Sequence, residues 1–404
     1  MNKQKKIDFS PPLITEEDIT EVVGVLRSGW ITTGPKVAAF EEALKKYTNA
    51  QEVAVLGSAT SGLELILRIL NIKAGDEVIT TPYTFTASAS VISHVGASIV
   101  FADVDQDSFL ISSEDIAKKI TNRTKAIITV DYGGTLCDYE AIQEILREKS
   151  DLYKSESNSF ASAFKRIPII ADSSHAFGAE LNGIKTGAIA DFTAFSFHAV
   201  KNLTTAEGGA VCLKSNSNLN IKEFRQLLKL YSLHGQNNDA FKKTSSGWQY
   251  DILFPGYKFN MTDIQAALGL SQLKRYKETL KFRETIFNRY LINLKNNTNC
   301  ILPKFDINKI KSAYHLFPVR VNGFNEDQRD RLIAYMKEQG IATNVHFKPL
   351  PMMTAYRNLG FSIEDYPNAF KVYENVITLP VHQKLSLNDV DYITDNFQQG
   401  IKDI

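Results

Sequence analysis

The sequence predicts an α/β protein with a mostly parallel central sheet. From residue 52 onward, short apolar segments alternate with segments whose apolar residues recur every three or four positions, which are the periods of strands and of amphipathic helices. Several of the apolar segments are uninterrupted, as is typical of parallel strands covered by helices on both faces. Of the 404 residues, 44% are hydrophobic and 23% are charged. This is an ordinary globular composition, and it argues against a disordered, collagen-like or coiled-coil chain.

Two helices are predicted ahead of the sheet. Residues 15–26 carry their apolar side chains on one helical face, and Thr15 with Asp18 resembles a capping box at the start. A second helix is predicted over residues 37–47. The turn-rich segment 28–35 lies between the two helices.

Seven strands are predicted from short apolar runs, and a helix over residues 60–71 follows the first of them. The predicted strands cover residues 52–56, 77–80, 98–101, 126–130, 167–171, 192–197 and 210–213.

The rest of the chain predicts one insertion and a second domain. Residues 149–166 are rich in serine and charge, which indicates a surface insertion. A long helical stretch is predicted over residues 262–289, and shorter strands and helices follow after residue 300. We therefore expect a large α/β domain over residues 1–265 and a small α+β domain over residues 266–404.

Charge and cysteine content limit the classes of function. The chain has 46 Lys and Arg against 45 Asp and Glu, whereas a nucleic-acid-binding protein usually shows a basic excess. The three cysteines form no Cys-x-x-Cys pair, and they are too few for a disulfide scaffold. We find no apolar core of a signal peptide near the N-terminus and no run of eighteen apolar residues. A reduced, cytoplasmic setting with no membrane or nucleic-acid partner is expected.

Candidate site residues follow directly after four of the predicted strands. They are Gly57 to Gly62, Pro82 to Phe85, Asp172 to His175, and His198 to Lys201 with Ser196 beside them. Ligands bind beyond the carboxyl ends of the strands in open α/β sheets. We expect these four groups to converge on one rim.

The segment from Gly57 to Gly62 is suited to a phosphate. It opens a predicted helix, where backbone N–H groups and the hydroxyls of Ser58 and Thr60 can hold an anion. The lysine and the Ser or Thr of an ATP-binding P-loop are replaced by Leu63 and Glu64. An ordinary helix N-cap is the alternative.

Asp172 and Lys201 have the chemistry of a pyridine cofactor site. A buried carboxylate needs a partner, and a protonated ring nitrogen would be one. A lysine in an apolar setting can form a Schiff base with a carbonyl compound. The alternatives are a structural aspartate and a surface lysine. A metal site with His175 and His198 is disfavoured, because no zinc-ligand spacing is present, and neither G-x-S-x-G nor G-x-G-x-x-G occurs.

In combination, these groups resemble a known family, the DegT/DnrJ/EryC1/StrS sugar aminotransferases, which have the aspartate-aminotransferase fold (fold type I) and use pyridoxal 5′-phosphate. Within that family, the blocks are most similar to enzymes that make UDP-4-amino-4-deoxy-L-arabinose and to the C4 aminotransferases of pseudaminic acid synthesis. The resemblance covers nearly the whole chain. Its main blocks are residues 28–36, 75–78, 170–175, 195–209 and 255–266.

The resemblance implies a role for each cofactor contact. Lys201 carries the cofactor and moves the proton during catalysis, Asp172 pairs with the pyridinium, and Phe85 stacks on the ring. Lys258 and Asn260 reach the phosphate in the partner subunit, which implies a homodimer. The implied contacts are Ser58, Ala59, Thr60, Phe85, Asp172, His175, Ser196, Lys201, Lys258 and Asn260.

The resemblance also implies an amino transfer from L-glutamate to a UDP-linked 4-keto sugar for surface glycans. Transfer to C3 of a keto sugar or to a keto-cyclitol is the nearer alternative. A non-catalytic cofactor-binding regulator is the remote one. The substrate is expected to contact Trp30, Ile31, Thr32, Tyr83, His198 and His346.

Overall fold

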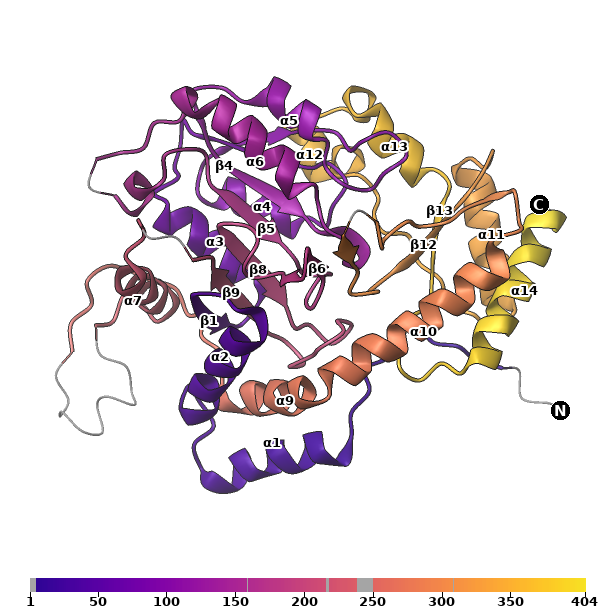
Figure 1. The fold of residues 1–404 in the computed structure, drawn as a ribbon, viewed down its shortest axis with the longest axis horizontal. Helices are drawn as coiled ribbons and strands as arrows, with labels where there is room; N and C mark the ends of the chain where they lie inside the picture. Colours follow the sequence, from indigo (N-terminus) through magenta and orange to yellow (C-terminus); the bar gives the residue numbers. More distant parts are fainter. Residues whose placement is uncertain (1–4, 158, 216–217, 238–249, 308) are drawn as a thin grey trace.

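The computed structural model describes residues 5–157, 159–215, 218–237, 250–307 and 309–404. At its centre is a seven-stranded sheet in the order β1-β9-β8-β5-β4-β2-β3 (Figure 1). The strands are β1 (Glu52–Leu56), β2 (Glu77–Thr80), β3 (Ser98–Phe101), β4 (Thr124–Val130), β5 (Ile169–Asp172), β8 (Phe192–Ser196) and β9 (Gly209–Leu213).

The sheet is mostly parallel, as predicted. Neighbouring strands from β8 through β5, β4 and β2 to β3 all pair in parallel. Only β9 runs the other way, between β1 and β8. The carboxyl ends of β1, β5 and β8 therefore lie at the same edge of the sheet, which is the edge that the four candidate groups follow.

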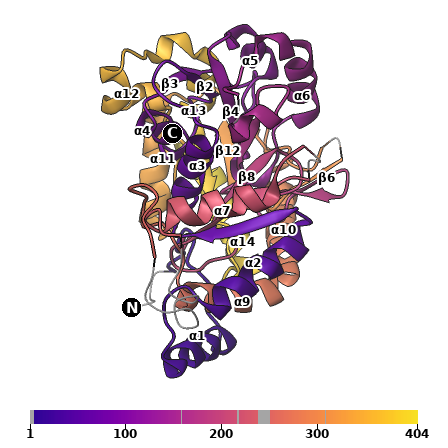
Figure 2. The same ribbon diagram turned by 90° about the vertical axis from the view of Figure 1, so that its left-hand side faces the viewer.

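Helices cover both faces of the sheet. One face packs against α3 (Ala59–Ile69), α4 (Ala87–His94) and α7 (Ile221–Ser232). The other packs against α2 (Pro35–Thr48), α5 (Ser113–Lys119), α6 (Tyr139–Glu148) and α9 (Asp263–Lys274). Figure 2 shows α7 on one side of β1 and α2 with α9 on the other. Because both faces are buried, the strands read as continuous apolar runs in the sequence.

A second, antiparallel sheet lies in the C-terminal part of the chain (Figure 1). It consists of β10 (Cys300–Ile301), β12 (Phe317–Val321) and β13 (Val376–Leu379). The helices of this part are α10 (Tyr276–Leu294), α11 (Glu326–Glu338), α12 (Thr354–Asn358), α13 (Pro367–Tyr373) and α14 (Leu387–Asp403), and α10 runs from the region of the central sheet to α14.

Two small features complete the chain. Three short strands form a separate sheet, β11 (Ile310–Lys311), β6 (Glu180–Leu181) and β7 (Ile184–Lys185). Before the first helix, α1 (Glu16–Ser28), Ile7 pairs with Ile341 and is buried in the core of the C-terminal part. The domain boundary at residue 265 stays a prediction. Among the described residues, no helix combines the length and the apolar character needed to cross a bilayer.

The predicted helical stretch over residues 262–289 is present as two helices, α9 and α10, separated by one residue. The helix breaks at Arg275, whose backbone (φ −107°, ψ 13°) separates α9 from α10. The Arg275 guanidinium pairs with the buried carboxylate of Asp18 in α1. This contact ties α9 to α1 and leaves α10 to run toward the C-terminal part.

The segment over residues 149–166 is only partly a surface insertion. Phe160, Ala161 and Phe164 are buried in the core beneath α3 and α7. The rings of Phe160 and Phe224 stack with their centroids 5.6 Å apart. Residue 158 of the segment lies outside the described residues. The serine-rich composition did not indicate that Phe160 and Phe164 pack in the core and hold the segment there.

Candidate active site

A cavity of about 890 Å³ lies at the carboxyl edge of the central sheet, between this sheet and the C-terminal part. Its volume is in the range of small-molecule sites. The structure brings the four groups that follow the strands together in its wall. Ten residues singled out in the sequence line it: Ser58, Ala59, Thr60, Phe85, Asp172, His175, Ser196, His198, Lys201 and His346.

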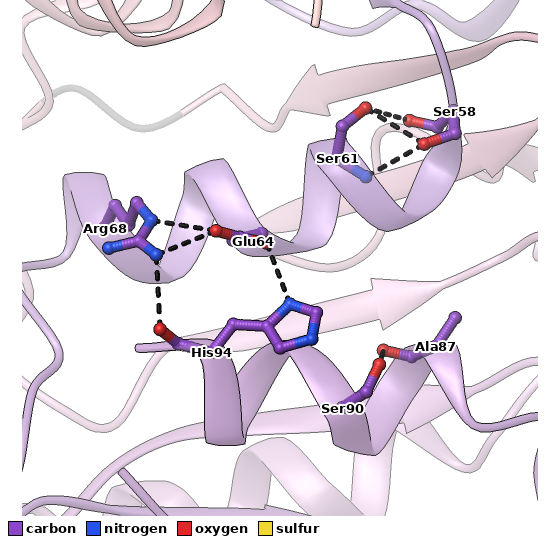
Figure 3. A network of polar contacts seen from close by, with 7 residues as sticks. All are labelled: Ser58, Ser61, Glu64, Arg68, Ala87, Ser90 and His94. Carbon is purple, nitrogen blue, oxygen red and sulfur yellow. Dashed lines mark hydrogen bonds and ion pairs between the residues drawn. The ribbon is translucent and has the colours of Figure 1, made fainter. Parts of the chain in front are cut away.

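The start of α3 forms one end of the cavity. Ser58 is the N-cap, and its hydroxyl accepts a hydrogen bond from the Ser61 N–H at 3.1 Å (Figure 3). The backbone N–H groups of Ala59 and Thr60, in the first turn, have no acceptor within the helix. These groups form the positive end of the helix dipole, and this end of the helix favours an anion.

Gly209 allows the close approach that shapes this end. A Cβ atom at Gly209 would lie 2.4 Å from the Ala59 nitrogen and 2.7 Å from the Phe195 carbonyl oxygen. Strand β9 can therefore pass directly beside the start of α3 only because residue 209 has no side chain. The shape of this end of the cavity therefore depends on the backbone contact between Gly209 and Ala59.

A polar network ties α3 to α4, the helix that follows Phe85. Glu64 of α3 is buried, and its carboxylate accepts two hydrogen bonds from Arg68, at 2.8 and 3.0 Å. The same carboxylate lies 2.9 Å from Nδ1 of His94, at the end of α4 (Figure 3). These contacts tie the middle and the last turn of α3 to the end of α4.

Asp172, at the end of β5, is a buried carboxylate that forms no direct ion pair among the described residues. It accepts hydrogen bonds from the hydroxyls of Ser88 at 2.7 Å and Ser174 at 2.5 Å, and from the Ser174 N–H at 3.2 Å. These bonds orient the carboxylate, and the Lys201 ammonium group is a cation that interacts with it. A buried carboxylate of this kind is suited to a cationic ligand.

Lys201 is buried in the wall of the same cavity. Burial lowers the pKa of its ammonium group to about 8, and the Asp172 carboxylate offsets part of this effect. The amine is therefore available as a nucleophile and as a base close to neutral pH. The predicted pair, a carboxylate and a lysine of perturbed pKa on one rim, is present.

His175 and His346 stay neutral beside Lys201. Burial and the lysine lower the pKa of His346 to about 4 and that of His175 well below its ordinary value. The His175 ring stacks on Phe347 with the centroids 5.7 Å apart. Neutral imidazoles add hydrogen-bonding groups without a second positive charge next to the lysine.

His346 belongs to a segment, residues 344–350, that forms one wall of the cavity. Its ends are fixed by the Asn344–Thr378 backbone pair and by the hydrogen bond from the Leu350 N–H to the Pro82 carbonyl at 2.8 Å. In the middle, the His346 carbonyl accepts from the hydroxyls of Tyr83 and Tyr132, at 2.6 and 2.7 Å. Tyr83 is thus fully buried behind the wall and does not line the cavity.

The other predicted residues lie together beside the cavity, where the Gly57 N–H donates to the Phe259 carbonyl at 2.7 Å. Trp30, Ile31, Thr32, Lys258 and Asn260 do not line this cavity. The Asn260 amide donates to the Thr33 hydroxyl at 2.7 Å, and the Asp263 N–H donates to the Thr32 carbonyl at 3.0 Å. The two segments therefore form one surface patch, which we call the 30/260 patch.

Three site residues were missed in the sequence: Asp131, Asn202 and His315. Asp131 comes directly after strand β4, and Asp172 is the last residue of the neighbouring strand β5, so a search for polar residues at strand ends could have found it. Its carboxylate accepts from Ser173 at 2.5 Å, and burial raises its pKa to about 6. His315 comes from a loop before β12, and no sequence pattern indicates its place beside His175.

Pyridoxal phosphate fits this arrangement. The start of α3 is suited to the phosphate and Asp172 to the ring nitrogen, while Lys201 has the amine that binds the aldehyde carbon. When bound, the cofactor supplies an electron sink for the reacting carbon. Within the described ranges, no three His, Cys, Asp or Glu side chains are grouped as around a metal ion.

Fold and site together define a pyridoxal-phosphate-dependent enzyme of fold type I. Comparison with known proteins carries the assignment further. The family model of the DegT/DnrJ/EryC1/StrS aminotransferases matches residues 12–398, and the chain belongs to this family. The resemblance seen in the sequence is confirmed.

Two relatives match almost end to end. The spore coat polysaccharide biosynthesis protein SpsC of Bacillus subtilis is 35% identical over 99% of both chains. The UDP-4-amino-4-deoxy-L-arabinose–oxoglutarate aminotransferase of Shewanella sediminis is 36% identical over 95% of both chains.

Solved structures of similar proteins support the same family assignment. Spr1654 of Streptococcus pneumoniae, described as a sugar aminotransferase and crystallised in its pyridoxamine-phosphate form, has a TM-score of 0.96 and 46% identity, over 98% of this chain and all of the other. PseC of Helicobacter pylori, an aminotransferase of pseudaminic acid biosynthesis, has a TM-score of 0.87 and 30% identity, over 99% of this chain and all of the other. The protein is a sugar aminotransferase that uses pyridoxal phosphate.

Proposed function

We propose that this enzyme transfers an amino group from L-glutamate to C4 of a UDP-linked 4-keto sugar, in a pathway of surface polysaccharide synthesis. The chemistry rests on one observation: the Lys201 amine and the buried Asp172 carboxylate share one cavity. The acceptor is argued from similarity. The name of the Shewanella sediminis relative contains a UDP group, a 4-amino sugar and oxoglutarate, the keto acid of glutamate.

In this reaction the side chains have separate tasks. Lys201 moves a proton at the carbon that loses or gains the amino group. Asp172, oriented by Ser88 and Ser174, keeps the cofactor nitrogen charged. Phe85, which is 63% exposed and lines the cavity, has an open ring face for stacking.

The cavity wall carries three carboxylates, Asp131, Asp172 and Glu207, and one lysine that is available to an anionic group of the substrate. Lys201 and Lys348 are the only Lys or Arg side chains among its described lining residues. Since Lys201 serves the amino transfer, Lys348 is the cation that remains for a carboxylate or a phosphate. Both the donor and a UDP-linked acceptor bring such groups to the site.

We also propose that the active enzyme is a homodimer. Lys258 and Asn260 lie in the 30/260 patch, outside the cavity of their own subunit. A second subunit would bring this patch to the neighbouring cavity, where Lys258, Asn260 and Trp30 to Thr32 would contact cofactor or substrate. We expect a cytoplasmic enzyme, and its cysteines are free, as is usual under reducing conditions.

The first experiment is an absorption spectrum of the purified protein before and after addition of L-glutamate. We expect a visible cofactor band that bleaches with glutamate and returns when a UDP-4-keto sugar is added. Return with a 3-keto but not a 4-keto nucleotide sugar would contradict C4 transfer. A band that responds to no amino donor would refute glutamate as donor and support a cofactor-binding regulator.

A further inference from the structure

Three polar side chains pack together behind Lys201: Asn202, His315 and His175. Asn202 and His315 are 7% and 5% exposed. The His175 and His315 rings lie with their centroids 4.6 Å apart. Both rings also line the cavity. The reaction described above assigns no task to Asn202 or to His315.

The orientation of the Asn202 amide fixes the proton of His315. A backbone carbonyl can only accept, and the Ala313 carbonyl lies 2.7 Å from Nδ2 of Asn202. The amide NH₂ must therefore face Ala313, so Oδ1 faces Nδ1 of His315, at 2.8 Å. Since this oxygen can only accept, Nδ1 of His315 carries the proton, and Nε2 of a neutral ring is bare.

His175 is held in the opposite tautomer. A backbone N–H can only donate, and that of Gly133 lies 3.3 Å from Nδ1 of His175. Nδ1 is therefore the acceptor, and a neutral His175 carries its proton on Nε2. The two neighbouring rings differ in the position of one proton.

The loop that carries His315 is fixed by a buried cation. The Arg283 guanidinium donates to the carbonyls of Tyr314 and His315, at 2.8 and 2.7 Å. The charged or titratable groups that face the His315 ring are His175, Lys201, Arg283 and His346. All four are cations or become cations on protonation, and together with burial they keep the pKa of His315 well below its ordinary value.

We propose that Asn202 and His315 are positioning residues of the active site. Asn202 holds His315 as the neutral Nδ1–H tautomer, and the His315 ring holds His175 in place as a neutral Nε2–H donor beside Lys201. An oxyanion of the bound cofactor, such as its phenolic oxygen, is the acceptor that this donor suits. The proposal does not depend on which sugar is the acceptor.

The test is nuclear magnetic resonance of the protein labelled with ¹⁵N-histidine, read with and without pyridoxal phosphate. Two-bond proton–nitrogen correlations report which ring nitrogen carries the proton, and His175→Gln and His315→Gln identify the two sets of signals. We expect the proton on Nδ1 of His315 and on Nε2 of His175, with no protonation of either ring between pH 6 and 8. The reverse tautomer of His315, or its protonation within this range, would overturn the proposal.

Two variants of Asn202 separate positioning from bulk packing. Asn202→Leu removes the acceptor, and the proton of His315 should then move to Nε2 in a measurable fraction of molecules. Asn202→Asp keeps the acceptor and adds a negative charge, so His315 should stay Nδ1–H and gain its second proton at a pH higher by about one unit or more. Unchanged His315 signals in both variants would refute the role of Asn202.

Asn375→Leu is the matched control. Asn375 is also buried, at 6% exposure, and its amide oxygen accepts from Arg320 at 3.0 Å, outside the cavity lining. Its replacement should cost stability yet leave the His175 and His315 signals unchanged. If this control moves them as much as Asn202→Leu does, the signals report general loosening and the proposal fails.

Discussion

At the scale of single residues, the buried Lys201 lowers the free energy of unfolding of the protein when no cofactor is bound. Burial lowers its pKa from 10.5 to about 8 in the folded chain, whereas the unfolded chain keeps the ordinary value. The folded state thus binds fewer protons between pH 8 and 10.5, and stability rises with pH through this window. Below pH 8 the destabilisation is complete, and a pKa shift from 10.5 to about 8 corresponds to about 3 kcal/mol.

Lys201→Met should therefore stabilise the cofactor-free protein while abolishing turnover. Denaturant unfolding should show a gain of about 3 kcal/mol at pH 7 that shrinks as the pH rises from 8 toward 10.5. Lys337→Met, at an exposed position of α11, should change stability by no more than about 0.5 kcal/mol. A gain for Lys201→Met that is independent of pH would contradict the pKa argument.

Asp172→Asn tests the charge of the buried carboxylate. The amide can still bond Ser88 and Ser174, but it cannot compensate a protonated ring nitrogen. We expect cofactor to bind and the rate of the half-reaction with glutamate to fall by at least about tenfold, measured by stopped-flow absorbance. A rate equal to that of the wild type would remove Asp172 from this role.

The search for polar residues at the carboxyl ends of strands found most residues of the cavity, because it depends only on the topology of the sheet. Asp172, His175, Ser196 and Lys201 lie at or after the ends of strands of one sheet, and parallel strands end at one edge. His315 could not be found in this way, since Arg283 and Asn202 bring its loop to the site through contacts between distant segments. Tyr83 follows a strand as predicted, yet its hydroxyl binds the His346 carbonyl behind the cavity wall.

At the scale of elements, the start of α3 depends on the absence of a side chain in β9. Gly209→Ala would place a Cβ atom 2.4 Å from the Ala59 nitrogen and push the first turn of α3 out of place. We expect the affinity for pyridoxal phosphate to fall at least about tenfold, measured by fluorescence titration. Gly24→Ala is the control, because Gly24 lies in α1 with open space around it, and there alanine should add about 0.5–1 kcal/mol of stability.

The α3–α4 network offers a second test at this scale. Glu64→Ala removes the buried acceptor shared by Arg68 and His94 (Figure 3), and unfolding experiments should show a loss of about 1–3 kcal/mol. The exposed pair of Glu144 and Arg147 is the comparison, and Glu144→Ala should cost no more than about 0.5 kcal/mol. Equal losses of stability in the two variants would mean that the burial of Glu64 does not strengthen its contacts.

Sequence periodicity predicted the existence of most elements better than their ends. The sequence predicts helix on both sides of Arg275 and no break there, whereas the structure ends α9 at Lys274. Arg275 pairs with Asp18, more than 250 residues earlier in the chain, and such a contact has no local signal in the sequence. Likewise, the burial of Phe160 depends on α7 and is invisible in the serine-rich segment around it.

At the scale of the whole molecule, the proposed homodimer predicts complementation between inactive subunits. One variant is Lys201→Ala and the other is the double change Lys258→Ala and Asn260→Ala. If the 30/260 patch serves the neighbouring cavity, a mixed dimer has one site with both defects and one intact site. Equal mixing should restore about one quarter of wild-type activity, because half of the dimers are mixed and each has one working site of two.

Remixing of the separately purified variants after dissociation is the measurement. Each variant alone should have little activity, and recovery should follow the amount of mixed dimer seen by native mass spectrometry. Mixed dimers without activity would mean that the patch serves its own subunit, and the assignment of Lys258 and Asn260 to the partner would be wrong.

The reversed strand β9 has a consequence for how the chain acquires its structure. Strand β1 lies at the edge of the central sheet, where its neighbour is β9, and Leu56 meets Gly209 about 150 residues further along the chain. Such a distant pairing closes a long loop and is intrinsically slow to form. A ribosome must therefore release the chain beyond Leu213 before the first strand has a neighbour and before α3 has its final place. The cofactor pocket is therefore a late product of synthesis, because a chain that ends before β9 lacks the strand that places β1 and the start of α3.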